Sequence, residues 1–181
     1  LAAKNALGGG EGVLDGFHPD QRLSDGESTQ VGGGRITALH TPGHLGDHLS
    51  FVWQAEAEAP VLLSGDLVMG WSSTLISPPD GSLSAYRASL ARLERRPEKR
   101  YFPGHGPEIQ DGPALIKKHL EHRLARETAV LEELTKGPAL VVDLVDAIYR
   151  DVPKALHMAA GRNVLAHLVD LIERGVVKAS P

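Results

Sequence analysis

Apolar residues follow two different spacings along this chain, and the spacing changes near residue 112. Upstream, short apolar runs alternate with turns and predict strands at residues 35–40, 49–53, 61–63 and 100–102. One helix is predicted between the last two strands, where apolar residues recur at helical spacing and Ser82 is a suitable N-cap. Its apolar face consists of Leu83, Tyr86, Leu90 and Leu93. Residues 5–34 are rich in glycine and predict loops with one short strand.

Downstream of Pro113 the spacing is helical throughout. The apolar positions predict three helices, at about residues 113–136, 140–148 and 164–172. Gly175 suits the position that follows the third helix, and Val176-Val177 predicts a short strand. We therefore expect two domains, residues 1–112 and residues 113–181.

Composition narrows the class of protein. The chain has 181 residues, of which 41% are hydrophobic and 23% charged, with a net charge of -4 and no cysteine. These values are typical of a globular protein, and the absence of cysteine excludes disulfides and thiolate metal sites. No apolar run approaches the roughly 18–20 residues of a membrane span. We therefore expect a cytoplasmic protein with no membrane partner.

The candidate chemistry lies at three strand–turn junctions. His44 follows a strand through Thr41-Pro42-Gly43, Asp66 ends a strand through Ser64-Gly65, and His105 stands between two glycines. Two imidazoles and a carboxylate form a ligand set that suits Zn²⁺, Mn²⁺ or Fe. Taken singly, each motif has an ordinary interpretation as a surface histidine or a simple turn. The occurrence of all three motifs at strand ends is the basis for predicting a metal site.

Other residues near these motifs have two interpretations each. Asp47 and His48 could hold a metal ligand in place by hydrogen bonding, or they could form a solvated turn. Met69 and Trp71 are interpreted as core residues, with a substrate pocket as the alternative. A partly basic helical face is interpreted as solvated, with contact to phosphate or to the upstream domain as the alternative. This face consists of His119, His122, Arg123 and Arg126.

The three motifs together resemble the later metal-binding motifs of the metallo-β-lactamase superfamily. Residues 63–71 and 78–81 resemble its β-lactamase-like branch, which includes an endoribonuclease and carries a C-terminal winged-helix domain. The resemblance implies an α/β fold, the C-terminal half of an αββα sandwich, followed by a small, mainly helical winged-helix-like domain. It implies that His44 is the third histidine of one metal site, that Asp66 bridges two metals and that His105 completes the second site.

The chain departs from this family in one respect. The first family motif, His-x-His-x-Asp-His, is absent among its nine histidines. Two metals need about twice the three ligands identified here. We therefore expect the N-terminal half of the sandwich to lie outside this chain, and this chain alone to be inactive. The missing half, or a second copy, would cover the exposed sheet.

The resemblance implies a metal-dependent hydrolase. Two zinc ions, or Mn²⁺ or Fe, would create a hydroxide that attacks an ester, thioester, lactam or phosphodiester, including RNA. The alternative is a non-enzymatic module that binds nucleic acid or protein through its winged-helix-like domain. Residues 138–181 carry five basic and five acidic side chains, which gives no strongly basic surface.

Overall fold

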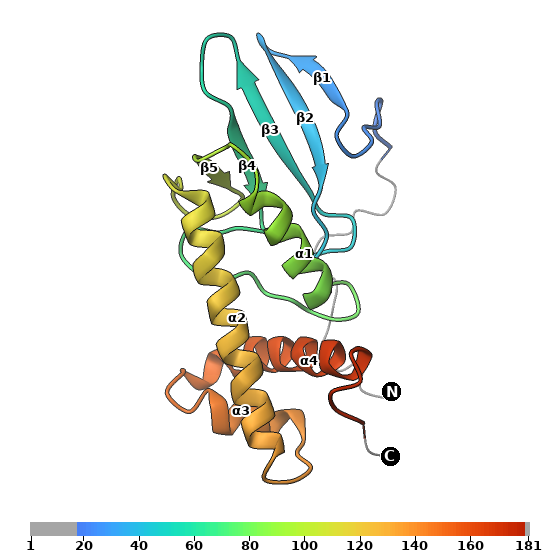
Figure 1. Cartoon of the computed structure of the whole chain (residues 1–181), viewed down its shortest axis with the longest axis vertical. Helices are drawn as coiled ribbons and strands as arrows, with labels where there is room; N and C mark the ends of the chain where they lie inside the picture. The colour runs from blue at the N-terminus through green and yellow to red at the C-terminus, as the bar shows by residue number, and fades with distance from the viewer. Residues whose placement is uncertain (1–17, 180–181) are drawn as a thin grey trace.

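The computed structural model describes residues 18–179 and contains one five-stranded sheet in the order β1-β2-β3-β4-β5 (Figure 1). The strands are β1 (Ser28–Val31), β2 (Gly34–His40), β3 (Leu49–Ala55), β4 (Val61–Gly65) and β5 (Tyr101–Pro103). Neighbouring strands are antiparallel from β1 to β4, whereas β4 and β5 are parallel. The chain between β4 and β5 contains α1 (Leu83–Glu94), as a parallel connection requires. The predicted strands and helix are confirmed.

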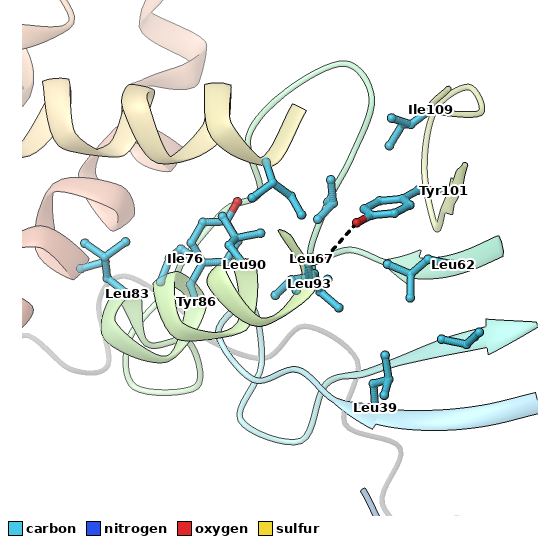
Figure 2. Close-up of a cluster of buried hydrophobic side chains, with 14 residues drawn as sticks. Leu39, Leu62, Leu67, Ile76, Leu83, Tyr86, Leu90, Leu93, Tyr101 and Ile109 are labelled. Atoms are coloured by element: carbon cyan, nitrogen blue, oxygen red, sulfur yellow. Dashed lines mark hydrogen bonds between the residues drawn. The ribbon is translucent and has the colours of Figure 1, made fainter. Parts of the chain in front are cut away.

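The apolar face of α1 packs against one face of the sheet (Figure 2). Side chains alternate along each strand, so Leu39, Val52 and Leu62 point to the same face and are buried. The Tyr101 hydroxyl donates to the Leu93 carbonyl oxygen at 3.4 Å and joins β5 to the end of α1. The Ser82 hydroxyl accepts from the Ala85 N–H, which confirms the expected N-cap. This core fixes the strands whose ends carry the candidate ligands.

The opposite face of the sheet is apolar and partly exposed. The register places Ile36 beside Trp53, Trp53 beside Val61, and Phe51 beside Leu63. All five side chains are half-buried, whereas Leu39, Val52 and Leu62 on the α1 side are buried. We call this surface the open sheet face.

Three α-helices follow the sheet: α2 (Gly112–Leu134), α3 (Val141–Ile148) and α4 (His157–Glu173), with a short 3₁₀ turn, η2 (Lys154–Leu156), before α4. Figure 1 shows α2 running away from the sheet and α4 lying crosswise to α2. The prediction of an unusually long first helix is confirmed, because α2 has 23 residues. None of the helices in the described part of the chain has the length and hydropathy needed to cross a membrane.

The predicted strand at Val176-Val177 is wrong. Gly175 has a φ of +71° and follows the C-terminal end of α4, as expected for this glycine. The backbone N–H groups of Val176 and Val177 both donate to the Leu171 carbonyl oxygen, at 2.9 and 3.4 Å. These donors therefore cap the helix, and Val177 packs on the helical core instead of pairing in a sheet.

The helices contribute to two apolar clusters. Ile116 of α2 and Ala166 of α4 belong to the cluster beneath α1, whereas Val130 and Leu144 belong to a second cluster among α2, α3 and α4. Helix α2 thus begins beside the predicted boundary at Gly112-Pro113 but packs on both sides of it. The division into residues 1–112 and 113–181 stays a prediction.

Two buried histidines make stability depend on pH. His119 and His167 are 6% and 1% exposed. Burial, followed by the nearby Arg123 charge, lowers the pKa of His119 to about 4 and that of His167 to about 3, from 6.5. Arg87 and His122 also lower the pKa of His167, and Glu127 raises it. Below pH 6.5 the unfolded chain therefore binds more protons than the folded chain, so acid destabilises the fold.

We predict that the free energy of unfolding falls as the pH is lowered from about 6.5 towards 4, and is insensitive to these groups above that range. Each histidine contributes a slope of up to about 1.4 kcal/mol per pH unit. His167→Leu should remove one such slope in denaturant titrations at successive pH values. His18→Leu is the control, because His18 is exposed. An unchanged slope in His167→Leu would contradict the assignment.

Candidate functional site

The structure brings His44, Asp66 and His105 together at one edge of the sheet. Oδ2 of Asp66 lies 4.0 Å from Nε2 of His44 and 3.7 Å from Nε2 of His105. The register makes β2, β4 and β5 run in the same direction, so the residues that follow them reach the same edge. Strand direction therefore explains why three separated motifs meet.

The His44 imidazole is oriented by the backbone of a later loop. Its Nδ1 lies 2.9 Å from the Leu75 carbonyl oxygen, which can only accept. Nδ1 therefore carries a proton and donates to this carbonyl, and Nε2 is the nitrogen nearer Asp66. Metal-ligating histidines are commonly held in this way. The side chain is 11% exposed, so its orientation is further restricted by packing.

Two glycines, Gly65 and Gly104, bring the ends of β4 and β5 close together beside Asp66. The Gly104 N–H donates to the Gly65 carbonyl oxygen at 2.9 Å, which ties the end of β5 to the end of β4. A Cβ atom at Gly104 would overlap Oδ1 of Asp66. The Gly-Asp and Pro-Gly-His motifs are therefore coupled, because the second must leave room for the carboxylate of the first.

His48 accepts a hydrogen bond from the backbone of Asp66. The Asp66 N–H donates to Nε2 of His48 at 3.2 Å, so Nδ1 carries the proton and donates to the Thr41 hydroxyl at 3.0 Å. Burial, followed by the His44 charge, lowers the pKa of His48 and favours this neutral form. The contact supports the interpretation that His48 positions a ligand, which stays a prediction. Asp47 is exposed.

The three side chains fit part of a metal site. Separations of 3.7 and 4.0 Å are too long for hydrogen bonds, and they exceed by a few tenths of an ångström the roughly 3.3–3.6 Å between two donors on one tetrahedral Zn²⁺ ion. Both imidazoles approach the same carboxylate oxygen, Oδ2 of Asp66. Within residues 18–179, however, no group of three or more His, Cys, Asp or Glu side chains is arranged to hold a metal ion. The fit is therefore partial, and further donors are needed.

Trp71 lies beside this site and is exposed. Its side chain is 68% exposed and lies against Gly106, next to His105, where a Cβ atom would overlap the indole. The interpretation of Trp71 as a core residue is wrong, whereas Met69 is buried as expected. The small and polar residues that flank Trp71 in the sequence could have indicated its exposure, because they offer an indole little apolar surface to pack against.

Sequence reasoning did not identify the hydrogen bonds that connect Asp66 to the C-terminal helices. The Thr74 hydroxyl donates to the Asp66 carbonyl oxygen, and Arg123 of α2 donates to the Thr74 carbonyl oxygen. His119 and Arg123 are buried, so the interpretation of their helical face as solvated is wrong for both. Contact with the upstream domain is confirmed for Arg123. Its signal in the sequence was its place seven residues after Ile116, on the apolar face of the predicted helix.

Two family models match this chain. The model described as the metallo-beta-lactamase superfamily matches residues 3–105, more than half of the chain. The model described as the beta-lactamase associated winged helix domain matches residues 141–181. The two matches lie in the same order as the sheet and the helices.

Relatives and solved structures agree with these matches. A beta-lactamase-like protein 2 homolog of Caenorhabditis elegans is 33% identical over 93% of this chain and 54% of its own length. An atrochrysone carboxyl ACP thioesterase of Aspergillus chevalieri is 33% identical over 74% of this chain and 44% of its own length. The crystal structure of a metallo-beta-lactamase family protein from Thermus thermophilus superposes with a TM-score of 0.75 at 30% identity, over 91% of this chain and 54% of that chain. This chain thus spans about half the length of the curated relatives it matches.

The close approach of Gly104 to Asp66 yields a test of the site. We predict that Gly104→Ala displaces the Asp66 carboxylate and weakens metal binding about 10- to 100-fold, the range typical of residues that orient ligands. Titration against a chromogenic chelator measures this in the protein that contains this chain. Gly46→Ala is the matched control, because its Cβ atom would lie 3.9 Å from the nearest atom. Equal affinities in the two variants would contradict this geometry.

Proposed function

This chain belongs to the metallo-β-lactamase superfamily, and we propose that it forms the C-terminal part of a metal-dependent hydrolase in that family. The observation that supports this most directly is Oδ2 of Asp66, which faces Nε2 of both His44 and His105. One carboxylate oxygen between two imidazoles is the arrangement expected of a ligand that bridges two metals.

The residues of this chain hold and orient the metal centre in this proposal. His44, Asp66 and His105 would bind zinc, or Mn²⁺ or Fe, with the remaining ligands supplied from outside the described residues. When bound, the metal supplies Lewis acidity and lowers the pKa of a coordinated water to about 7. The Leu75 carbonyl fixes the orientation and the tautomer of His44. The His105 side chain is 69% exposed, so this part of the site faces solvent.

Thioesters are the substrate class that we propose to test first. A relative named as an acyl-carrier-protein thioesterase covers 74% of this chain. The exposed indole of Trp71, next to His105, offers an apolar surface beside the metal ligands for an acyl group. Esters, lactams and phosphodiesters, including RNA, are the other outcomes of a substrate screen.

The open sheet face implies a partner. Ile36, Phe51, Trp53, Val61 and Leu63 form adjacent cross-strand pairs that remain partly exposed. Contiguous apolar patches larger than a few hundred Å² are uncommon on monomers. We propose that the N-terminal half of the same sandwich, or a second copy of this chain, covers this face.

We predict that Asp66→Ala in the protein that contains this chain lowers kcat/KM for hydrolysis at least about 100-fold, because a metal contributes several kcal/mol to the transition state. The variant should also lose bound metal while it keeps its fold, since the Asp66 side chain is 32% exposed. Activity on a thioester and on a phosphodiester is measured together with metal content by elemental analysis. Asp151→Ala, an exposed carboxylate in the helical part, is the control. Unchanged turnover and metal content would show that Asp66 is not a ligand.

A parent protein that binds nucleic acid but hydrolyses neither substrate would favour the non-enzymatic alternative.

We predict that the 181-residue chain on its own associates with itself or with another polypeptide through the open sheet face. Light scattering and intact-mass analysis measure this, and Leu63→Lys should shift the chain towards the monomer. Leu140→Lys is the control, because Leu140 is also exposed but lies before α3, away from the sheet. A monodisperse monomer of the unaltered chain, with no second polypeptide, would refute the proposed cover.

A further inference from the structure

The metal ligands are supported by one short loop segment, Thr74 to Ile76, between β4 and α1. The Thr74 hydroxyl donates to the backbone carbonyl of Asp66, and the Leu75 carbonyl accepts from Nδ1 of His44. Two consecutive residues of the segment thus contact two of the three candidate ligands. A shift of this segment would move both the Asp66 backbone and the His44 ring.

The C-terminal helices hold the same segment from the other side. Arg123 of α2 donates through Nη2 to the Thr74 carbonyl oxygen and through Nη1 to Oδ1 of Asn163, at 2.9 Å in the second case. The Ile76 N–H also donates to Oδ1 of Asn163, at 3.2 Å. Asn163 belongs to α4, so one amide oxygen joins α2, α4 and the loop segment. Thr74, Ile76 and Arg123 are buried, so these contacts are shielded from water.

The chemistry of Arg123 is unusual for a residue with only a structural role. Its side chain is 2% exposed, and both acceptors are neutral oxygens, so the contacts do not neutralise its charge. The guanidinium also lies over the Tyr86 ring, 5.4 Å from its centroid. A buried charge with neutral partners is a poor source of stability. A planar fork that fixes two acceptors at once is, however, well suited to setting the position of a loop.

We infer that Arg123 and Asn163 are positioning residues of the metal centre, which act through residues 74–76 on His44 and Asp66. The winged-helix domain is then part of the machinery that orders the ligands, in addition to any role in binding a partner. This inference rests on the proposed function, because it concerns the same ligands.

Variants of Asn163 in the protein that contains this chain test the inference. Asn163→Leu removes the shared acceptor, whereas Asn163→Asp keeps an oxygen for both Arg123 and Ile76. We expect Asn163→Leu to weaken metal binding about 10- to 100-fold, as measured against a chromogenic chelator, and Asn163→Asp to stay within a few-fold of the parent. Asp170→Asn is the matched control. Asp170 also joins α4 to α1, through Arg87 at 3.2 Å, but its polar partners are Arg87 and Arg174, and neither belongs to the loop segment.

A second measurement does not need the metal. Long-range ¹H–¹⁵N spectra of the metal-free protein report which ring nitrogen of His44 carries the proton. We expect the Nδ1-protonated form in the parent and in Asp170→Asn, and a mixture of tautomers in Asn163→Leu. Should Asn163→Leu be too unstable to study, Arg123→Lys provides the same test, because lysine keeps the charge but loses the fork.

The outcomes separate the two proposals. Parent-like metal affinity and a parent-like His44 tautomer in Asn163→Leu, with a loss of stability equal to that of Asp170→Asn, would overturn the positioning role alone. A parent protein that binds no metal at His44, Asp66 and His105 would overturn the proposed function, and the positioning role with it.

Discussion

Because β2, β4 and β5 run in the same direction, the residues that follow them must reach the same edge of the sheet. His44, Asp66 and His105 are far apart in the sequence, and no local motif would bring them together. The packing of α1 on the sheet makes this possible, since α1 carries the chain back so that β5 can lie parallel to β4. The candidate metal ligands therefore depend on strand direction first and on side-chain chemistry second.

The elements with strong periodicity could be predicted from the sequence, and so could the residues at their ends. The face of α1 was visible in the spacing of Leu83, Tyr86 and Leu90, and these residues are buried. The three candidate ligands were visible because glycine and proline mark the strand ends around them. Hydrophobic spacing reports which face of an element is apolar, and strand ends follow from the turn residues.

The remaining features depend on which backbone acceptors are in reach, either in a distant loop or at the end of a neighbouring helix. Arg123 lies on the same helical face as Ile116, but its charge favours solvent, and only its contact with the loop beside Asp66 accounts for its burial. Val176 and Val177 have strand-forming side chains, yet their backbone donors are taken up by the end of α4. In each case a hydrogen-bond requirement overrides the preference of the side chain. For Arg123 the acceptor, Thr74, lies in a loop whose position could not be known from the sequence. For Val176 and Val177 the acceptor, Leu171, lies in the preceding helix, so the requirement is local and outweighs strand propensity.

The hydrogen bond between Ile76 and Asn163 also has a kinetic meaning. It joins residues that are 87 positions apart, whereas the hairpins of the sheet join near neighbours in the sequence. Closing a long loop carries a larger entropic cost, and contacts of high sequence separation slow folding. The hairpin strands β1 to β3 should therefore form early, while the loop behind the ligands becomes ordered only when α4 docks. During synthesis β5 is made before α4, so the edge of the sheet would be complete before Asn163 can bind residues 74–76. Until α4 docks, the backbone N–H of Ile76 would therefore be exposed to water.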